Sequence, residues 1–255
     1  MWSGSVEYKN ASQLISFCNN SGRPMTAIVW QYTPLGFSIG ADGRRRGADG
    51  AIESETMQKV HSVQVLGQGI VYAWSGTTSA VRADGIPVDL KFLTDCALET
   101  IDVPSSVSFS DFMKILANNI HTLFVAYIGA AAKSYKLDEI ARATFFAYFK
   151  GLPYVGEIIL KHSGTTILKP ETLCFSPPSK FRVFSGSKLI CDTLKDKLSV
   201  EPKTLYAAST LVKEYIEECV KHQESDADCA NIGGHIHLGE LTPTGFSWVS
   251  PPILG

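Results

Sequence analysis

This 255-residue sequence has no large surplus of positive or negative charge, no cysteine pairs of the CxxC type and no long apolar runs. Its 23 basic and 25 acidic residues give a formal net charge of −2, so binding to nucleic acid or to an anionic membrane is not expected. No run of about 18 residues is free of polar interruption, so no membrane-spanning helix is expected. The six cysteines are scattered and form no CxxC pair, which indicates reduced thiols in a cytoplasmic protein and neither a disulfide framework nor a zinc site.

The residues that are present fit one globular domain. The hydrophobic share of 45% and the charged share of 19% are those of a folded chain and not of a disordered one. The length is ordinary for a single domain, and it allows a sizeable buried core.

The stretch from residue 25 to residue 60 holds the residues with the most chemical promise. Two apolar runs, 27–32 and 37–41, flank a Thr-Pro-Leu-Gly tetrapeptide, which predicts a β-hairpin. Because side chains alternate along a strand, Asp42 ends the second run on a face of small residues. Thr26 begins the first strand, and Lys59 follows the polar loop after the second.

These three residues can form a nucleophilic site. A threonine hydroxyl is a poor nucleophile without a neighbouring base, and the α-amine of Thr26 could be that base if Thr26 began the mature chain. Such an amine titrates near pH ~8, close to working pH. A lysine cation nearby would favour the deprotonated hydroxyl, and an aspartate would hold the lysine in place. Spacing alone also fits a hairpin that carries the three residues for structural reasons.

The order of motifs along the chain resembles the proteasome β-subunit family and the HslV-like peptidases within it. The residues that carry the resemblance are Thr26, Ile28-Val29, Gly36, Gly40-Ala41-Asp42, Lys59-Val60, Ser75-Gly76-Thr77-Thr78-Ser79-Ala80, Ser185-Gly186-Ser187 and Gly233-Gly234. The loop before Lys59 is one residue longer than is usual in the family. An extra segment lies near residues 81–108, where we expect a loop without chemistry.

The resemblance implies a threonine-type peptidase or amidase with a four-layer αββα sandwich of the N-terminal-nucleophile hydrolase type, an α+β fold. It implies that Thr26 is the nucleophile, tuned by Asp42 and Lys59. It further implies that the Gly76 N–H stabilises the oxyanion and that Ser185 supports the amine, although Ser185 also fits a helix N-cap. Neither a metal nor another cofactor is implied. The expected partners are a peptide or amide substrate and copies of the same chain in a homo-oligomeric ring, and the family also allows an ATPase partner.

Two positions depart from the family pattern and support an alternative function. Cys229 and Ile232 stand where the family often has an aspartate and a serine, and Asp228 lies one position away from the first of them. The alternative is therefore a catalytically inactive proteasome-like scaffold or assembly subunit. Hydrolysis of peptides that depends on Thr26 would distinguish the two.

Residues 1–25 are expected to be a propeptide or a leader outside the mature protein, with 26–255 as the hydrolase domain. Three alternatives remain open. Autolysis could expose Thr26, although Met25 stands where a glycine is usual. Translation could instead start at Met25, with the initiator removed, which is our preferred interpretation. If the segment stayed attached, Thr26 would have no free amine and the chain would not be a threonine hydrolase.

The remaining patterns predict secondary structure and two weaker sites. Helical spacing predicts three helices: one that begins at residue 108, a second over about 137–149 and a third over about 203–222. The three arginines 44–46 are either a solvated basic turn or part of a substrate cleft that favours acidic groups. His235 and His237 share one side of a strand and could bind a metal, but no third ligand is evident.

Overall fold

A computed structural model describes most of the chain. The described residues are 26–47, 50–65, 67–81, 86–104, 106–128, 139–164, 166–177, 182–184 and 187–253. The expected leader, residues 1–25, therefore lies outside the described residues.

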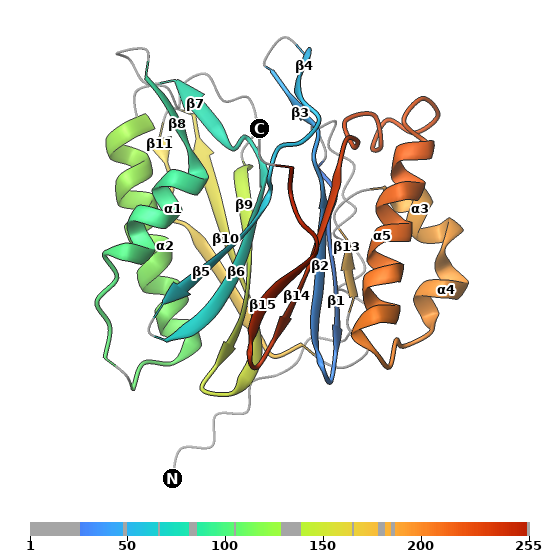
Figure 1. The fold of residues 1–255 in the computed structure, drawn as a ribbon. Coiled ribbons are helices and arrows are strands. Elements are labelled where there is room, and N and C mark those ends of the chain that lie inside the picture. Colours follow the sequence, from blue (N-terminus) through green and yellow to red (C-terminus); the bar gives the residue numbers. More distant parts are fainter. Residues whose placement is uncertain are drawn as a thin grey trace.

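Two antiparallel sheets form the centre of the molecule (Figure 1). The first has the strand order β13-β1-β2-β14-β15. Its strands are β1 (Ile28–Thr33), β2 (Gly36–Asp42), β13 (Arg182–Phe184), β14 (Ile236–Thr242) and β15 (Gly245–Ser250). The register of β1 and β2 pairs Ile28 with Ala41 and Thr33 with Gly36, as expected for the hairpin predicted from the sequence.

The second sheet has the order β11-β10-β9-β6-β5, with one further strand, β12, paired with β10. Its strands are β5 (Val60–Val65), β6 (Gln68–Gly76), β9 (Glu139–Phe149), β10 (Leu152–Ser163), β11 (Thr166–Ile167) and β12 (Glu171–Phe175). Two small ribbons complete the described strands: β3 (Arg45–Arg46) with β4 (Ile52–Ser54), and β7 (Ser79–Val81) with β8 (Pro87–Asp89).

Helices lie beside each sheet. The described helices are α1 (Leu90–Glu99), α2 (Phe109–Ile128), α3 (Lys188–Thr193), α4 (Lys195–Ser199) and α5 (Leu205–Lys221). In Figure 1, α1 and α2 lie beside the six-stranded sheet, whereas α3, α4 and α5 lie beside the five-stranded sheet. The chain thus combines α and β structure, with antiparallel pairing in every described ladder. Among the described helices, none is long and apolar enough to cross a membrane.

The alternation of β2 explains how the layers pack. Phe37 and Ile39 face a buried core that also contains Val71 and Phe146 of the second sheet, so the two sheets bury their apolar faces against each other. The opposite face of β2 lies under α5. A Cβ at Gly40 would come within 2.6 Å of the Val212 side chain, so this glycine lets α5 approach the sheet closely.

Two expectations from the sequence are wrong. Residues 139–149 form strand β9 and not part of a helix over 137–149. Apolar residues such as Phe145 and Phe146 are buried on opposite faces of β9, and a run that is apolar on both sides has no period that separates helix from strand. The segment 81–108 is not a plain loop either, because it contains α1, whose N-cap Asp89 accepts from the N–H of Phe92.

Two predicted helices are confirmed. The helix predicted to begin at residue 108 is α2, and the N–H of Asp111 donates to Oγ of Ser108, 3.1 Å away. The helix predicted over 203–222 is α5. Both helices bury apolar residues that recur at helical spacing, so the spacing of apolar residues in the sequence identified them correctly.

Candidate functional site

Asp42 ends β2 as a fully buried carboxylate with four donors. Its Oδ1 accepts from Nζ of Lys59 at 2.8 Å and from the N–H of Ala27 at 3.0 Å. Its Oδ2 accepts from the N–H groups of Gly233 at 3.1 Å and of Arg44 at 3.3 Å. Buried charges need such partners, so the side chain joins four chain segments at one point.

Lys59 stands directly before β5 in the second sheet, with a side chain that is only 10% exposed. Its own N–H donates to Nε2 of His237 at 3.1 Å, which fixes the backbone where the side chain begins. Burial lowers the pKa of the Lys59 ammonium, although Asp42 acts in the opposite direction. Burial likewise raises the pKa of the Asp42 carboxyl, against the effect of Lys59 and of the backbone donors.

Thr26 lies at the start of the described chain, half-buried and directly before β1. The next residue, Ala27, is bound to Asp42 twice, because its N–H donates to the carboxylate and its carbonyl accepts from the N–H of Asp42 at 3.2 Å. Ile28 faces the core between the sheets, so the alternation of the strand directs Thr26 toward the same side. The structure thus brings Asp42 and Lys59 into contact and places Thr26 one residue from their network.

Gly76 ends β6 with φ of +90°, a conformation that favours glycine. A Cβ there would also come within 2.7 Å of the Ile140 carbonyl oxygen. The next N–H, that of Thr77, donates to the same oxygen at 2.9 Å. Because N–H groups alternate between the two edges of a strand, the Gly76 N–H points away from β9, toward the edge where Lys59 leads into β5.

Ser185, expected to support the amine, lies outside the described residues. Its neighbour in the Ser-Gly-Ser motif, Ser187, caps α3 by accepting from the N–H of Ile190. The Ser187 hydroxyl also donates to the carboxylate of Asp226. The sequence left an N-cap role open for Ser185, and in the structure Ser187 fills the N-cap position of α3.

Cys229 and Ile232, which replace the polar residues of the family pattern, are fully buried among apolar side chains. Burial raises the pKa of the Cys229 thiol to about 11, which keeps it protonated and unreactive at neutral pH. Asp228 is only half-buried, and its N–H donates to Asp226, 3.0 Å away. The Asp226 carboxylate accepts from the Ser187 hydroxyl, the N–H of Asp228 and the Cys229 thiol.

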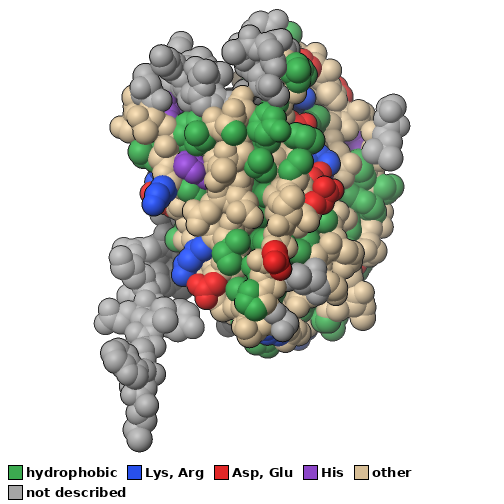
Figure 2. All heavy atoms as spheres, turned by 90° about the vertical axis from the view of Figure 1, so that its left-hand side faces the viewer, with side chains coloured by type: hydrophobic (Ala, Val, Ile, Leu, Met, Phe, Trp, Pro, Cys, Tyr) green, Lys and Arg blue, Asp and Glu red, His purple; other side chains and the backbone are tan. Residues whose placement is uncertain are grey.

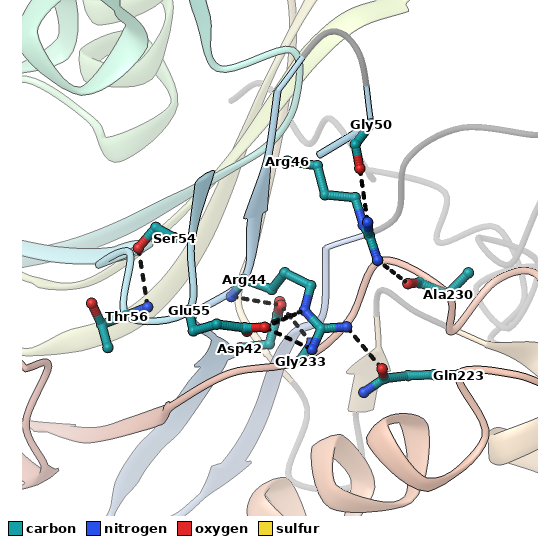
Figure 3. A network of polar contacts seen from close by, with 10 residues as sticks. All are labelled: Asp42, Arg44, Arg46, Gly50, Ser54, Glu55, Thr56, Gln223, Ala230 and Gly233. Atoms are coloured by element: carbon teal, nitrogen blue, oxygen red, sulfur yellow. Dashed lines mark hydrogen bonds and ion pairs between the residues drawn. The ribbon is translucent and has the colours of Figure 1, made fainter. Parts of the chain in front are cut away.

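The three arginines are not a solvated turn, because each of them has partners within the chain. Arg44 pairs with Glu55 and donates to Gln223, which follows the end of α5, at 2.8 Å (Figure 3). Arg45 pairs with Glu53 at 2.9 Å and donates to Oγ of Ser79. Arg46 donates to the carbonyl oxygens of Gly50 and Ala230.

The sequence reasoning missed the Arg44–Glu55 pair and the role of His237. Two glutamates follow the arginines in the same loop, and this alternation of charge was the available signal for the pair. His237 accepts from Lys59, and burial beside the Lys59 charge lowers its pKa to about 3, so it stays neutral. His235 instead contacts the carbonyl oxygen of Pro251 at 2.8 Å. Across the described residues, no group of three or more His, Cys, Asp or Glu side chains is arranged to hold a metal.

Comparison with known proteins gives a likeness of fold. No protein-family model and no curated protein matches the chain. A solved structure of the Anbu (Gly-1) mutant from Hyphomicrobium sp. strain MC1 is similar, with a TM-score of 0.57 and 14% identity over 88% of this chain and 87% of that one. The helical assembly of the Anbu complex from Pseudomonas aeruginosa gives 0.54 and 12% over 89% and 87%. Anbu (ancestral beta-subunit) from Yersinia bercovieri gives 0.52 and 12% over 88% and 87%.

These neighbours correct the family expected from the sequence. The motif order led to the proteasome β-subunit and HslV-like family, whereas four solved structures similar to this chain are Anbu proteins, which form a distinct family. At 12–14% identity, the likeness establishes that the chain has the fold of the Anbu structures.

Proposed function

We propose that the chain is a threonine-type peptidase or amidase in which Thr26 is the nucleophile. The observation that carries the proposal is the buried Asp42, which holds the Lys59 ammonium at 2.8 Å and the backbone of Ala27, next to Thr26, at 3.0 Å. A buried lysine and carboxylate beside a residue that could begin the chain are what nucleophile activation requires. The proposal includes the four-layer αββα sandwich of N-terminal-nucleophile hydrolases for residues 26–255, and Ser185 as a support of the amine.

The proposed reaction proceeds by acyl transfer. The Thr26 hydroxyl oxygen attacks the substrate carbonyl carbon while its proton passes to the α-amine of the same residue. The Gly76 N–H donates to the oxyanion that forms on the carbonyl oxygen. The protonated amine then gives its proton to the leaving nitrogen as the C–N bond breaks, which leaves an ester on Thr26. Water attacks this ester with the amine again as base, and the acid product departs. Lys59, held by Asp42, favours deprotonation of the hydroxyl throughout.

An assembly of identical chains forms part of the proposal. One of the similar Anbu structures is described as a helical assembly. On this chain, exposed apolar side chains lie on α1 and α2, namely Phe92, Val125 and Tyr127, and the face on which these helices lie shows scattered hydrophobic atoms (Figure 2). We infer a homo-oligomer in the cytoplasm, with a ring as the expected form and an ATPase as a possible partner. Sedimentation of the purified chain should show a species well above the monomer.

Peptide hydrolysis by a chain that starts at Thr26 tests the catalytic role. Thr26→Ala removes the hydroxyl and should abolish turnover, whereas Thr26→Ser keeps a hydroxyl and an amine and should retain part of it. A peptidyl electrophile such as a β-lactone should add its mass to Thr26 in the wild type and not in Thr26→Ala. Hydrolysis that persists in Thr26→Ala would refute the proposal.

A catalytically inactive scaffold is the second candidate. It is favoured by Cys229, whose buried thiol stays protonated, and by the buried apolar Ile232, because neither brings a charged group to the loop before Gly233. It predicts an assembled protein that hydrolyses no peptide and takes up no electrophile at Thr26. Assembly without either reaction would favour the scaffold.

A further inference from the structure

The pair of Arg44 and Glu55 occupies the loop that surrounds the buried Asp42 (Figure 3). The Arg44 guanidinium makes three contacts with the Glu55 carboxylate, at 2.9 to 3.1 Å. Its remaining Nη1 donates to Oε1 of Gln223, two residues beyond the end of α5, at 2.8 Å. The arginine side chain is 12% exposed, so the fork of the guanidinium is held by two partners in a largely dry place.

The same pair lies against the two glycines that precede β14. A Cβ at Gly233 would come within 2.4 Å of the Arg44 Cζ, so the guanidinium covers this peptide directly. A Cβ at Gly234, whose φ is +75°, would come within 2.2 Å of the Glu55 carbonyl oxygen. Two backbone hydrogen bonds join the same two segments. The N–H of Arg44 donates to the Gly233 carbonyl at 2.8 Å, and the N–H of His235 donates to the Glu55 carbonyl at 2.7 Å.

These contacts involve the same backbone groups that donate hydrogen bonds to the Asp42 carboxylate. Two of its four donors are the N–H groups of Arg44 and Gly233, the residues that the guanidinium joins. We propose that the Arg44–Glu55 pair, anchored to Gln223, is a positioning unit that clamps Gly233 against Asp42 and thereby orients the Asp42–Lys59 pair. This inference rests on the proposed function for its catalytic meaning, whereas the clamp itself can be measured without turnover.

The two members of the pair also act on Lys59 in opposite directions. Arg44 lowers the pKa of the Lys59 ammonium and Glu55 raises it. The other charged or titratable groups around Lys59 are Asp42 on β2 and His237 on β14. With both members present, the pair adds no net charge beside Lys59, so it holds the backbone with little effect on the lysine charge.

The experiment compares Arg44→Met, Glu55→Gln and the double variant. The matched control is the neighbouring ion pair of Arg45 and Glu53, removed by Arg45→Met and Glu53→Gln. This pair lies in the same loop, and among the described residues it has no hydrogen bond to Asp42 or Gly233. Hydrogen exchange of the Gly233 amide measures the clamp, with amides of β9 as an internal reference. Carbon NMR of labelled lysine, assigned with Lys59→Met, measures the pKa of Lys59.

Loss of the clamp should raise exchange of the Gly233 amide about tenfold or more in all three Arg44 and Glu55 variants, without change in β9. The Lys59 pKa should rise in Arg44→Met and fall in Glu55→Gln, by roughly half a unit to one unit, and return in the double variant. If the chain hydrolyses peptides, kcat should fall about 10- to 100-fold in all three variants with little change in KM.

The outcomes separate this inference from the proposed function. Unchanged Gly233 exchange, lysine shifts of one sign in both single variants, or equal effects from the control pair would overturn the clamp. Absence of peptide hydrolysis in the wild type would count against the proposed function alone, because the exchange and the lysine titration would still decide on the clamp.

Discussion

Nζ of Lys59 lies 2.8 Å from Oδ1 of Asp42, and the carboxylate has no solvent exposure. The two residues come from different sheets, so their contact joins the layers at the candidate site. A buried ion pair of this kind gives little net stability over an apolar pair, but removal of one member leaves a buried charge without its counter-ion. The stability of the fold therefore depends on the same two side chains that the proposed reaction uses.

Replacement of Lys59 by alanine should destabilise the protein at neutral pH by about 3 kcal/mol or more, because Asp42 stays buried without its cation. The loss should shrink as pH falls. In this variant burial holds the folded pKa of Asp42 above its unfolded value, so the folded state takes up a proton first and gains stability toward low pH. Urea denaturation at pH 7.5 and pH 5 measures both effects.

The double variant Asp42→Asn with Lys59→Met serves as the control for this prediction. It removes both charges together, so it should be more stable than Lys59→Ala and should show little pH dependence from this site. Equal destabilisation of the single and double variants at both pH values would show that the pair does not carry the effect.

The fold could be predicted from the sequence where an element has one apolar face or where a turn marks its end. Helix α5 has a single buried face, whereas the β1–β2 hairpin, in which both faces of β2 are buried, was marked by its Thr-Pro-Leu-Gly turn; each was found near its observed position. Strand β9 was mistaken for a helix because both of its faces are buried, one toward α1 and α2 and one toward the other sheet. The signal for α1 was present in the sequence, as Asp89 precedes Leu90 and Leu93 at helical spacing.

Gly76→Ala should destabilise the protein more than Gly67→Ala does. Both glycines have positive φ, +90° and +73°, so both substitutions carry a backbone penalty of about 1 kcal/mol. Only the substitution at Gly76 adds a steric clash, because a Cβ there would lie 2.7 Å from the Ile140 carbonyl oxygen, whereas a Cβ at Gly67 would have nothing within 4 Å. We expect a total of roughly 2 kcal/mol or more for Gly76→Ala by urea denaturation. Equal losses would mean that β9 moves aside easily.

Acid should weaken folding through His61. Burial lowers the pKa of His61 to about 4, so it stays neutral in the folded state while the unfolded chain takes up a proton below pH ~6.5. The free energy of unfolding should therefore fall as pH drops from about 6.5 to 4, by at most ~1.4 kcal/mol per pH unit from this group. His61→Gln should flatten the dependence over this window.

His222→Gln provides the comparison for that pH series. The His222 side chain is 32% exposed, against 8% for the whole of His61, so its removal should leave the slope nearly as in the wild type. Parallel stability curves for wild type and His61→Gln would contradict the role assigned to His61.

The site was less predictable than the fold. Asp42 and Lys59 were proposed from their place beside the hairpin and from the family resemblance, and the structure brings the two side chains into contact. The bond from Arg44 to Gln223 spans 179 positions, and it forms because α5 packs against the first sheet and brings the residues after its end to this loop. Such a partner has no local pattern, so periodicity and motif spacing do not reveal it.

The last prediction concerns the chemical state of Thr26, on which the proposed mechanism depends. The base is its α-amine, and an amide nitrogen cannot replace it because the lone pair is delocalised into the carbonyl. Ala27, the following residue, is held by Asp42 through one bond from its N–H to the carboxylate and one from the Asp42 N–H to its carbonyl, so Thr26 should keep its place whether or not residues 1–25 precede it. A chain expressed from Met25 should therefore lose that methionine and hydrolyse peptides.

Intact mass measured for the full-length chain and for the chain that starts at Met25 separates the routes to a free Thr26. If translation begins at Met25, Thr26→Ala in the short chain should not change where the protein starts. If autolysis exposes the amine, the full-length wild type should lose 1–25 while full-length Thr26→Ala retains them, because the hydroxyl that attacks the preceding bond is gone. A native protein that hydrolyses peptides with residues 1–25 still attached would rule out the amine as base, and with it the threonine mechanism.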